Sequence, residues 1–429
     1  MNKQDTTGRT TTAARSGTVG AGTAPGRFIA GLIVAQWLSF VALFTPILVS
    51  LPVRVGELDP DGKTASLSRV LAIGAVLAMI TNPLCGALSD RTTSRFGRRR
   101  PWLLAGSLVT TLGTFICGTA ESLTTLTAGW AVTQLGANAV YAALLATIPD
   151  RVPNHRQGRV SGAIGMTLYM AMVLGAVIAR PLIGHNLSLF LLPGLLGLAG
   201  VTALVWIMRD DAPADRATLP PFRLADFVRS FWISPRLHPD FAWNFCGRFL
   251  MFCGISTMTG YQFYFAVDRL GQSVPAASAT VAVAAVITMS GTVLGSLTGG
   301  WLSDRTGRRK IFVFVAALIS VIGLVLTACA QTTAAFYTAA AVFSLGLGSY
   351  MAVDTALAIG VLPDRTAAAK DLGVLNIGNT LPQSLIPAIA PLFLGIGSAS
   401  GTNYTVLYLF GSACACAGAF AIHFIRAVR

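Results

Sequence analysis

Residues 86–101 read GALSDRTTSRFGRRRP, and residues 300–310 repeat this stretch in shortened form as GWLSDRTGRRK. Each copy lies between two apolar runs that are long enough to cross a membrane. A turn this rich in arginine cannot lie in lipid, so we expect the flanking helices to meet it on the cytoplasmic side. The repetition predicts a chain made of two related halves.

The composition is that of a membrane protein. The 429 residues are 54% hydrophobic and 11% charged, whereas soluble domains carry roughly 25% charged residues. The net charge of +14 does not indicate nucleic-acid binding, because the cations lie in short turns between apolar runs. The cysteines lie within apolar runs and the histidines lie at helix ends or in loops. The sequence therefore predicts no metal site, no cofactor and no enzyme.

Twelve apolar segments follow one another along the chain, and each is near the ~20 residues that span a bilayer. They predict an all-α membrane protein with twelve transmembrane helices in two pseudo-symmetric six-helix bundles. The predicted spans are 28–50, 68–89, 101–120, 123–148, 158–181, 187–208, 240–266, 275–302, 310–329, 333–362, 370–396 and 403–425.

The same pattern divides the chain into four parts. Residues 1–26 are expected to be a disordered cytoplasmic tail, 27–208 the N-terminal bundle, 209–239 a cytoplasmic linker and 240–429 the C-terminal bundle. Within the linker, residues 222–232 form either an amphipathic segment on the membrane surface or part of a plain tether.

The distribution of cations predicts the orientation. Only five of the 31 lysines and arginines fall on the outer side when the tail is placed inside: Arg54, Lys63, Arg69, Arg180 and Arg269. Arg248 lies within a helix, and all the others lie on the inner side. The positive-inside rule therefore places both termini in the cytoplasm, in a multi-pass protein of the plasma membrane that we expect to be a monomer.

Two landmarks recur at one offset in residue number. Gly86 and Gly300, which begin the two copies of the motif, are 214 residues apart. Pro149 and Pro363, each of which begins a Pro-Asp-Arg turn, are also 214 residues apart. This agreement favours the duplication of a six-helix unit.

The doubled motif, after the second and eighth of twelve spans, resembles that of the major facilitator superfamily of secondary transporters. The longer first copy is similar to the branch of glycoside:cation and sucrose:proton symporters. Three shorter stretches also resemble that branch: Arg248-Phe249-Leu250, Tyr264 to Asp268, and Val353-Asp354-Thr355-Ala356-Leu357 running to Leu362-Pro363-Asp364.

The resemblance implies that spans one, four, seven and ten line a central cavity, while spans two, five, eight and eleven form the moving interface. It also implies that Asp90 and Asp304 meet the N-termini of spans eleven and five, where a carboxylate is favoured by the helix dipole. The alternative is that these are loop charges that only set topology. The predicted gating residues are Asp90, Arg91, Gly97, Arg98, Arg99, Asp304, Arg305, Gly307, Arg308 and Arg309.

Two ionisable residues lie at membrane depth, where charge is expensive. Arg248 is eight residues past Asp240 and Asp354 is nine before Pro363, so they lie about 12 and 14 Å inside their helices. We predict a contact between them, direct or through water. The pair serves either to couple protons or bind solute, or as a static buried ion pair.

Polar side chains at helical spacing surround this pair in the predicted helices. Amides and phenols suit a neutral, polyhydroxylated solute, whereas interhelical hydrogen bonding is the structural alternative. The remaining predicted substrate or coupling residues are Trp37, Gln134, Asn138, Tyr141, Asn244, Tyr261, Tyr264, Tyr350, Asn376, Asn379 and Gln383.

The predicted function is proton-coupled transport of a small solute, a sugar or glycoside. Spans two and four lack acidic residues before their ends, in contrast to the cation-coupled glycoside symporters that the chain resembles, which favours protons over sodium. The runner-up is a proton-driven efflux antiporter for a drug or secondary metabolite. Drug antiporters usually carry a Gly-Pro pair in span five, and this chain lacks it there.

Overall fold

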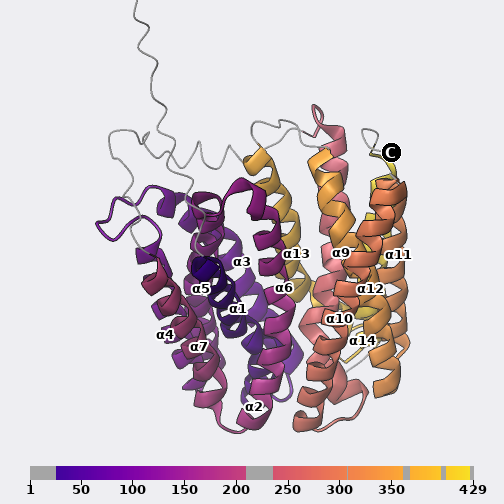
Figure 1. The fold of residues 1–429 in the computed structure, drawn as a ribbon. Helices are drawn as coiled ribbons and strands as arrows, with labels where there is room; N and C mark the ends of the chain where they lie inside the picture. The colour runs from indigo at the N-terminus through magenta and orange to yellow at the C-terminus, as the bar shows by residue number, and fades with distance from the viewer. Residues whose placement is uncertain (1–25, 209–234, 307, 361–367, 398–401, 426–429) are drawn as a thin grey trace, which may run out of the picture.

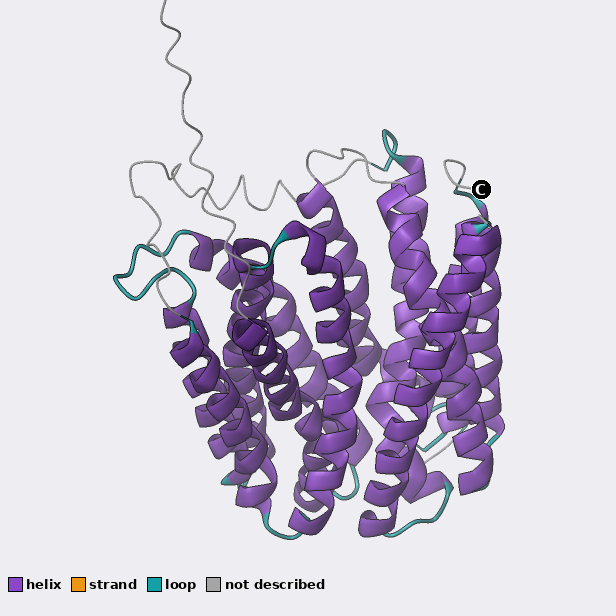
Figure 2. Cartoon of the chain, in the orientation of Figure 1, coloured by secondary structure: helices purple, strands orange, loops and turns teal. Residues whose placement is uncertain are grey.

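The structure, a computed structural model, describes residues 26–208, 235–306, 308–360, 368–397 and 402–425. These residues form helices and connecting turns, with no strand among them (Figure 2). Ten of the described helices are long and apolar enough to cross a membrane, and the long helices α9 and α13 complete the predicted set of twelve. The all-α fold with twelve spans is therefore confirmed.

The N-terminal bundle contains α1 to α7 (Figure 1). After the first helix the chain passes through a π-helical turn, Pro46–Ser50, where a proline without an N–H loosens the helix. The bounds of its helices are α1 Gly26–Thr45, α2 Leu51–Leu58, α3 Lys63–Asp90, α4 Arg100–Gly118, α5 Leu123–Arg151, α6 Asn154–Ala179 and α7 Asn186–Ile207.

The C-terminal bundle contains α9 to α14 and lies beside the first (Figure 1). Its last helix is capped by Asn403, whose side chain accepts a hydrogen bond from the Val406 N–H. The bounds of its helices are α9 Pro239–Tyr264, α10 Val274–Thr306, α11 Arg309–Cys329, α12 Thr333–Gly360, α13 Ala368–Leu394 and α14 Tyr404–His423.

The two bundles meet mainly through two pairs of helices. Helix α3 packs against α13, and α6 packs against α10, which are the second, eleventh, fifth and eighth spans. We call the end of the molecule that carries residues 90–100, uppermost in Figure 1, the basic end, and the other the opposite end. Helix α13 stays continuous across Pro382, Pro387 and Pro391 along this interface.

Two predicted boundaries were wrong at the opposite end. The first span continues through α2 to Leu58, and α3 begins at Lys63 rather than at residue 68. The additional helix α2 is accommodated because the Arg54 guanidinium donates to the Ala120 carbonyl and pairs with Glu57. Because these contacts satisfy the Arg54 guanidinium, a segment that contains a charged residue can extend an apolar helix.

The packing within the bundles refines the internal repeat. A side-chain carbon added to Gly136 of α5 would lie 2.4 Å from the Thr110 nitrogen, and one added to Gly346 of α12 would lie 2.5 Å from the Ser320 nitrogen. Gly346 lies 210 residues after Gly136, and Ser320 lies 210 residues after Thr110. The two sequence landmarks, in contrast, repeat at an offset of 214. The first arginine turn is longer than the second, which lowers the offset from 214 to 210, and the offset returns to 214 between Gly346 and Pro363.

Candidate functional site

The predicted contact between α9 and α12 is present. Arg248 donates from Nε to Asp354 Oδ2 at 2.8 Å, and its Nη2 pairs with the same oxygen. The Asp354 residue is only 2% exposed. An ion pair this enclosed is stable only while both partners are charged and in contact, because either charge alone would pay a large desolvation cost.

Two neighbours, each one helical turn before a member of the pair, complete this cluster. Asn244 is buried and its Nδ2 lies 3.4 Å from Asp354 Oδ1. The Asn244 Oδ1 atom and the Tyr350 hydroxyl have no hydrogen-bond partner among the described residues, although both are enclosed. We call Asn244, Arg248, Tyr350 and Asp354 the charged cluster.

A second polar group lies in the N-terminal bundle and contains only neutral side chains. Asn138 donates from Nδ2 to Gln134 Oε1 at 3.0 Å, and Asn82 of α3 donates to Asn138 Oδ1 at 3.5 Å. One turn further along α5, the Tyr141 ring lies 5.5 Å from the Phe40 ring of α1. The sequence analysis missed Asn82, which its position beside Pro83 inside an apolar span could have indicated. We call Asn82, Gln134, Asn138 and Tyr141 the amide cluster.

The structure places two predicted solute-binding tyrosines in contacts between the bundles at the opposite end. The Tyr261 hydroxyl lies 2.7 Å from Ser68 Oγ of α3, and the Tyr264 hydroxyl donates to the Pro52 carbonyl at 2.8 Å. Both tyrosines are buried. Their described polar partners are therefore groups of the other bundle.

An ion pair that the sequence analysis missed joins the bundles at the same end. Lys63 Nζ lies 2.5 Å from Asp268 Oδ1, while the Tyr404 hydroxyl donates to Asp268 Oδ2 at 2.7 Å. The Lys63 ammonium also lies 5.2 Å from the centre of the Tyr264 ring, within range of a cation–π interaction. Opposite charges in two outer turns were the only sequence signal.

The other predicted solute-binding residues are dispersed. The Trp37 indole N–H is enclosed without a partner among the described residues. On α13, Gln383 is exposed and its Nε2 lies 3.4 Å from the Asn379 carbonyl. The side chain of Asn376 lies outside the described residues.

At the basic end, the predicted gating residues form an ion-pair network within the N-terminal bundle. Arg99 pairs with Asp90 and, at 3.0 Å, with Asp150, and it also donates to Ser89 Oγ. Arg98 Nη2 lies 2.6 Å from Asp150 Oδ1. Arg99 is buried, so it acts as the hub that holds three chain segments together.

The backbone of this turn explains its glycine, because Gly97 has φ +87°, which disfavours a side chain. The contact expected between Asp90 and the start of α13 lies outside the described side chains, as do Asp304 and Gly307. In the second copy, Arg305 lies 5.3 Å from the centre of the Trp301 ring and Arg308 is exposed. The last two of the gating set, Arg91 and Arg309, are partly buried.

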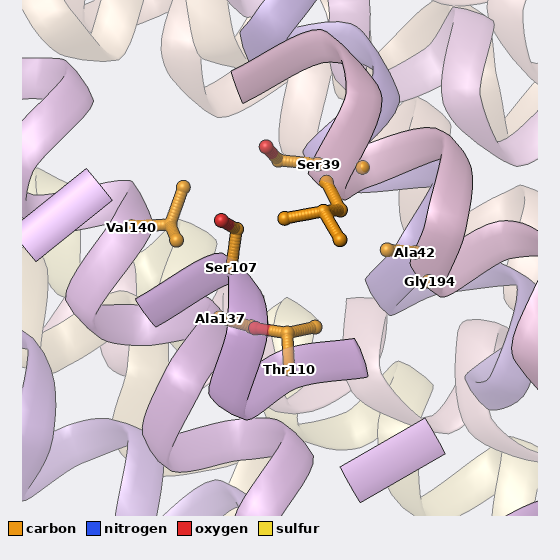
Figure 3. A pocket seen from close by; sticks show the side chains of 9 residues that line it. Ser39, Ala42, Ser107, Thr110, Ala137, Val140 and Gly194 are labelled. Carbon is orange, nitrogen blue, oxygen red and sulfur yellow. The ribbon is translucent and has the colours of Figure 1, made fainter. Parts of the chain in front are cut away.

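A small cavity lies inside the N-terminal bundle (Figure 3), and none of its lining residues belongs to the charged cluster. Its volume of about 10 Å³ is the space that one water molecule needs. It lies between α1, α4, α5 and α7 and is too small for an organic solute. The lining residues are Ser39, Ala42, Ser107, Thr110, Ala137, Val140, Gly194, Gly197 and Leu198.

Twelve membrane helices in two bundles, with a buried ion pair between α9 and α12, define a polytopic membrane protein. Residues 32–293 and 277–429 match the sequence profile of the Major Facilitator Superfamily, and the chain belongs to this superfamily. The fold is similar to that of the nucleoside transporter NupG, with a TM-score of 0.71 and 13% identity over 93% of this chain and 98% of that one. The protein is a transporter and not an enzyme.

Curated relatives match short parts of the chain. Sucrose transport protein SUC4 of Arabidopsis thaliana is 32% identical over 95 residues, which are 22% of this chain and 16% of the plant protein. The MFS efflux transporter aclA of Aspergillus oryzae is 29% identical over 166 residues, which are 38% of this chain and 29% of the fungal protein. The chain thus aligns with less than a third of either relative.

Proposed function

We propose that the protein is a proton-coupled symporter that carries a neutral sugar or glycoside by alternating access. The observation that carries this proposal is the Arg248–Asp354 pair, enclosed between α9 and α12 and bonded through Nε at 2.8 Å. Ionisable groups at membrane depth are costly and mark functional sites in transporters more often than structural ones.

The pair offers a simple coupling step. A proton that binds to the Asp354 carboxylate removes its charge and weakens its hold on the Arg248 guanidinium. The guanidinium then has free N–H donors for a solute hydroxyl, so a loaded site contains proton and solute together. Because the loaded and empty sites then differ in charge and contacts, binding shifts the balance between the two orientations of the bundles.

The contacts between the bundles support an orientation closed to the outside. Under the positive-inside rule the basic end is cytoplasmic and the opposite end faces out. The Lys63–Asp268 pair, with Tyr261 and Tyr264, joins the bundles at that outer end. A transport cycle must break these contacts for solute to enter from outside, in a plasma-membrane protein that functions as a monomer.

The neutral amide cluster supports an uncharged solute. Amide groups both donate and accept hydrogen bonds, as hydroxyl groups do, and so match a polyhydroxylated molecule. The similarity to a plant sucrose transport protein points the same way. Spans two and four have no acidic residue before Asp90 and Asp150 at their ends. Protons are therefore the coupling ion of this proposal, with no cofactor.

The test is proton movement in proteoliposomes while a panel of mono- and disaccharides is added outside. Wild-type protein should alkalinise the external medium with at least one sugar, and Asp354→Asn should abolish that response. Asp61→Asn is the matched control, because Asp61 is an exposed loop carboxylate. A proton response that is equal in wild type and Asp354→Asn would show that the coupling site lies elsewhere.

A second candidate, a proton-driven efflux antiporter for a drug or secondary metabolite, is favoured by the similarity to a fungal efflux transporter. It predicts no response to any sugar, exchange of a loaded amphipathic compound for protons, and resistance of cells that express the protein. In that case the same buried carboxylate would bind either the proton or the compound, but not both.

A further inference from the structure

Helices α1 and α7 pack together in the same way as helices α9 and α14. A side-chain carbon added to Gly200 of α7 would lie 3.1 Å from Leu38 Cβ, and one added to Gly418 of α14 would lie 3.1 Å from Leu250 Cβ. The two leucines differ in residue number by an offset of 212. Each position of α1 therefore corresponds to the position of α9 at this offset.

A second pair of close contacts gives the same correspondence. Gly197 of α7 approaches Ala42 of α1 at 3.1 Å, and Gly254 of α9 approaches Ala415 of α14 at 3.1 Å, measured from an added Cβ to the alanine Cβ. Position 42 of α1 thus corresponds to position 254 of α9, at the same offset as the leucines. Two independent contacts fix the register of the two helices.

This register makes Gln36 the counterpart of Arg248. In the other helix pair, α5 and α12 correspond at an offset of 210, so the counterpart of Asp354 is Leu144. The N-terminal bundle therefore has an amide where the C-terminal bundle has a guanidinium, and an apolar side chain where the C-terminal bundle has a carboxylate. Leu144 is buried in the core of its own bundle and cannot accept a hydrogen bond through its side chain.

Gln36 is enclosed without a partner. The residue is 1% exposed, and neither its side-chain oxygen nor its side-chain nitrogen has a hydrogen-bond partner among the described residues. Gln36 does not line the cavity of Figure 3. A buried amide with neither atom paired is unfavourable, so its presence requires an explanation.

The surroundings indicate what could pair with it. One turn further along α1, Phe40 contacts the Tyr141 ring of α5, which belongs to the amide cluster. Gln36 therefore lies one turn along α1 from the residue that contacts the amide cluster, the group of neutral side chains that the proposed function assigns to an uncharged solute. Gln36 occupies in α1 the position that Arg248 occupies in α9.

We propose that Gln36 is a solute-binding residue, whose carboxamide donates to and accepts from hydroxyl groups of the transported solute. The inference rests on the proposed sugar transport for the identity of the solute. Arg248 and Gln36 would then contact the solute from opposite bundles, one with a charged group and one with a neutral group. Hydroxyl groups of the solute would supply the hydrogen-bond partners that Gln36 does not find among the described residues.

The test compares wild type with Gln36→Met, which keeps the side-chain length and removes the amide. Loss of two hydrogen bonds should raise KM for the transported sugar about tenfold with little change in kcat. The melting temperature of the purified variant should equal or exceed that of wild type, because an unpaired buried amide is removed. Ser278→Ala is the matched control, since Ser278 is also buried and unpaired, on α10.

Deoxy analogues identify the contact. For one monodeoxy sugar, the wild type should bind about tenfold more weakly than it binds the parent, while Gln36→Met should lose nothing further. An unchanged KM for Gln36→Met would overturn the inference. If the melting temperature of this variant is lowered as well, Gln36 is bonded to a structural water or to its own bundle instead.

A separate measurement needs no sugar. Gln36→Cys should react with a small aqueous thiol reagent, and mass spectrometry of the labelled peptide resolves this site from the native cysteines. If Gln36→Cys is labelled but the protein transports no sugar, the solute is not a sugar, while Gln36 remains a binding residue in this proposal. No labelling in either the presence or absence of a proton gradient would refute the role of Gln36.

Discussion

The two bundles share their helix packing but place their charges at different depths. In the N-terminal bundle, the arginines Arg98 and Arg99 pair with carboxylates at the basic end, where Asp90 is 60% exposed. In the C-terminal bundle, Arg248 pairs with Asp354 inside the membrane. The positions that correspond to this pair in the first bundle are Gln36 and Leu144.

This difference shows that the repeated helix packing determines where the backbones lie close together, but not which side chains occupy the remaining positions. The glycine contacts of α4 with α5 recur between α11 and α12, and those of α1 with α7 recur between α9 and α14. Side chains that face away from these contacts are free to diverge. One bundle can therefore hold the protonatable group while the other supplies neutral hydrogen bonds.

The largest expected effect comes from breaking the buried pair on one side only. Arg248→Met leaves the Asp354 charge enclosed without its partner, and should cost about 3–5 kcal/mol of stability at neutral pH. The double variant Arg248→Met/Asp354→Leu removes both charges and should recover most of that loss. Thermal unfolding in one detergent measures both, and a single variant as stable as wild type would contradict the account.

A smaller effect is expected from Arg99→Met at the basic end. This variant also removes a partner of two carboxylates, but Asp150 keeps its pair with Arg98, and Asp90 is mostly exposed, so that water can replace its lost contact. The cost should be about 1–2 kcal/mol and should shrink as salt is added. A loss as large as that of Arg248→Met, insensitive to salt, would remove the contrast between the bundles.

The ion pair between the bundles should affect conformation more than stability. Lys63→Met removes the cation that holds Asp268, so the opposite end should open more often. Ser68, buried against Tyr261 further along α3, provides a reporter as Ser68→Cys. Its labelling by a membrane-impermeant thiol reagent should rise about tenfold in the Lys63→Met background. Equal labelling in both backgrounds would show that the pair does not keep this end closed.

The smallest effect concerns a partly buried carboxylate outside the membrane helices, that of Asp59. The Ser66 hydroxyl and the Gly62 N–H donate to Asp59 and lower the pKa of its carboxyl below the usual value of 3.8. A lowered pKa contributes stability that is present above pH 3.8 and is lost as the pH falls through the folded pKa.

In Ser66→Ala, which lacks the main donor, the pKa should return toward the ordinary value. The difference in melting temperature between wild type and Ser66→Ala should therefore be present near neutral pH and disappear in acid. A difference that persists or grows below pH 3 would assign the effect to packing rather than to this carboxylate.

The sequence predicted the fold well because membrane helices follow from local hydropathy. It also predicted the Arg248–Asp354 contact, since two charges at similar depth in an apolar background have few other partners. The start of α3 was missed because Lys63 is charged, although its charge is paired with Asp268. That pairing depends on the approach of two turns far apart in the chain.

Other features required the packed structure. The role of Arg99 as a hub between Asp90 and Asp150 depends on how the arginine turn folds, which its repetition does not reveal. The correspondence of Gln36 with Arg248 depends on an offset of 212, which differs from the 214 of the sequence landmarks. Only the close contacts at glycines, which have no sequence periodicity, establish that register.

The most direct test of the central claim compares two transport modes of Asp354→Asn in proteoliposomes. Exchange of labelled for unlabelled sugar across the membrane requires the bundles to alternate but needs no net proton movement. Our account predicts that exchange continues in this variant while accumulation driven by a proton gradient is lost. Accumulation at the wild-type level would contradict the account and leave Arg248–Asp354 as a structural ion pair.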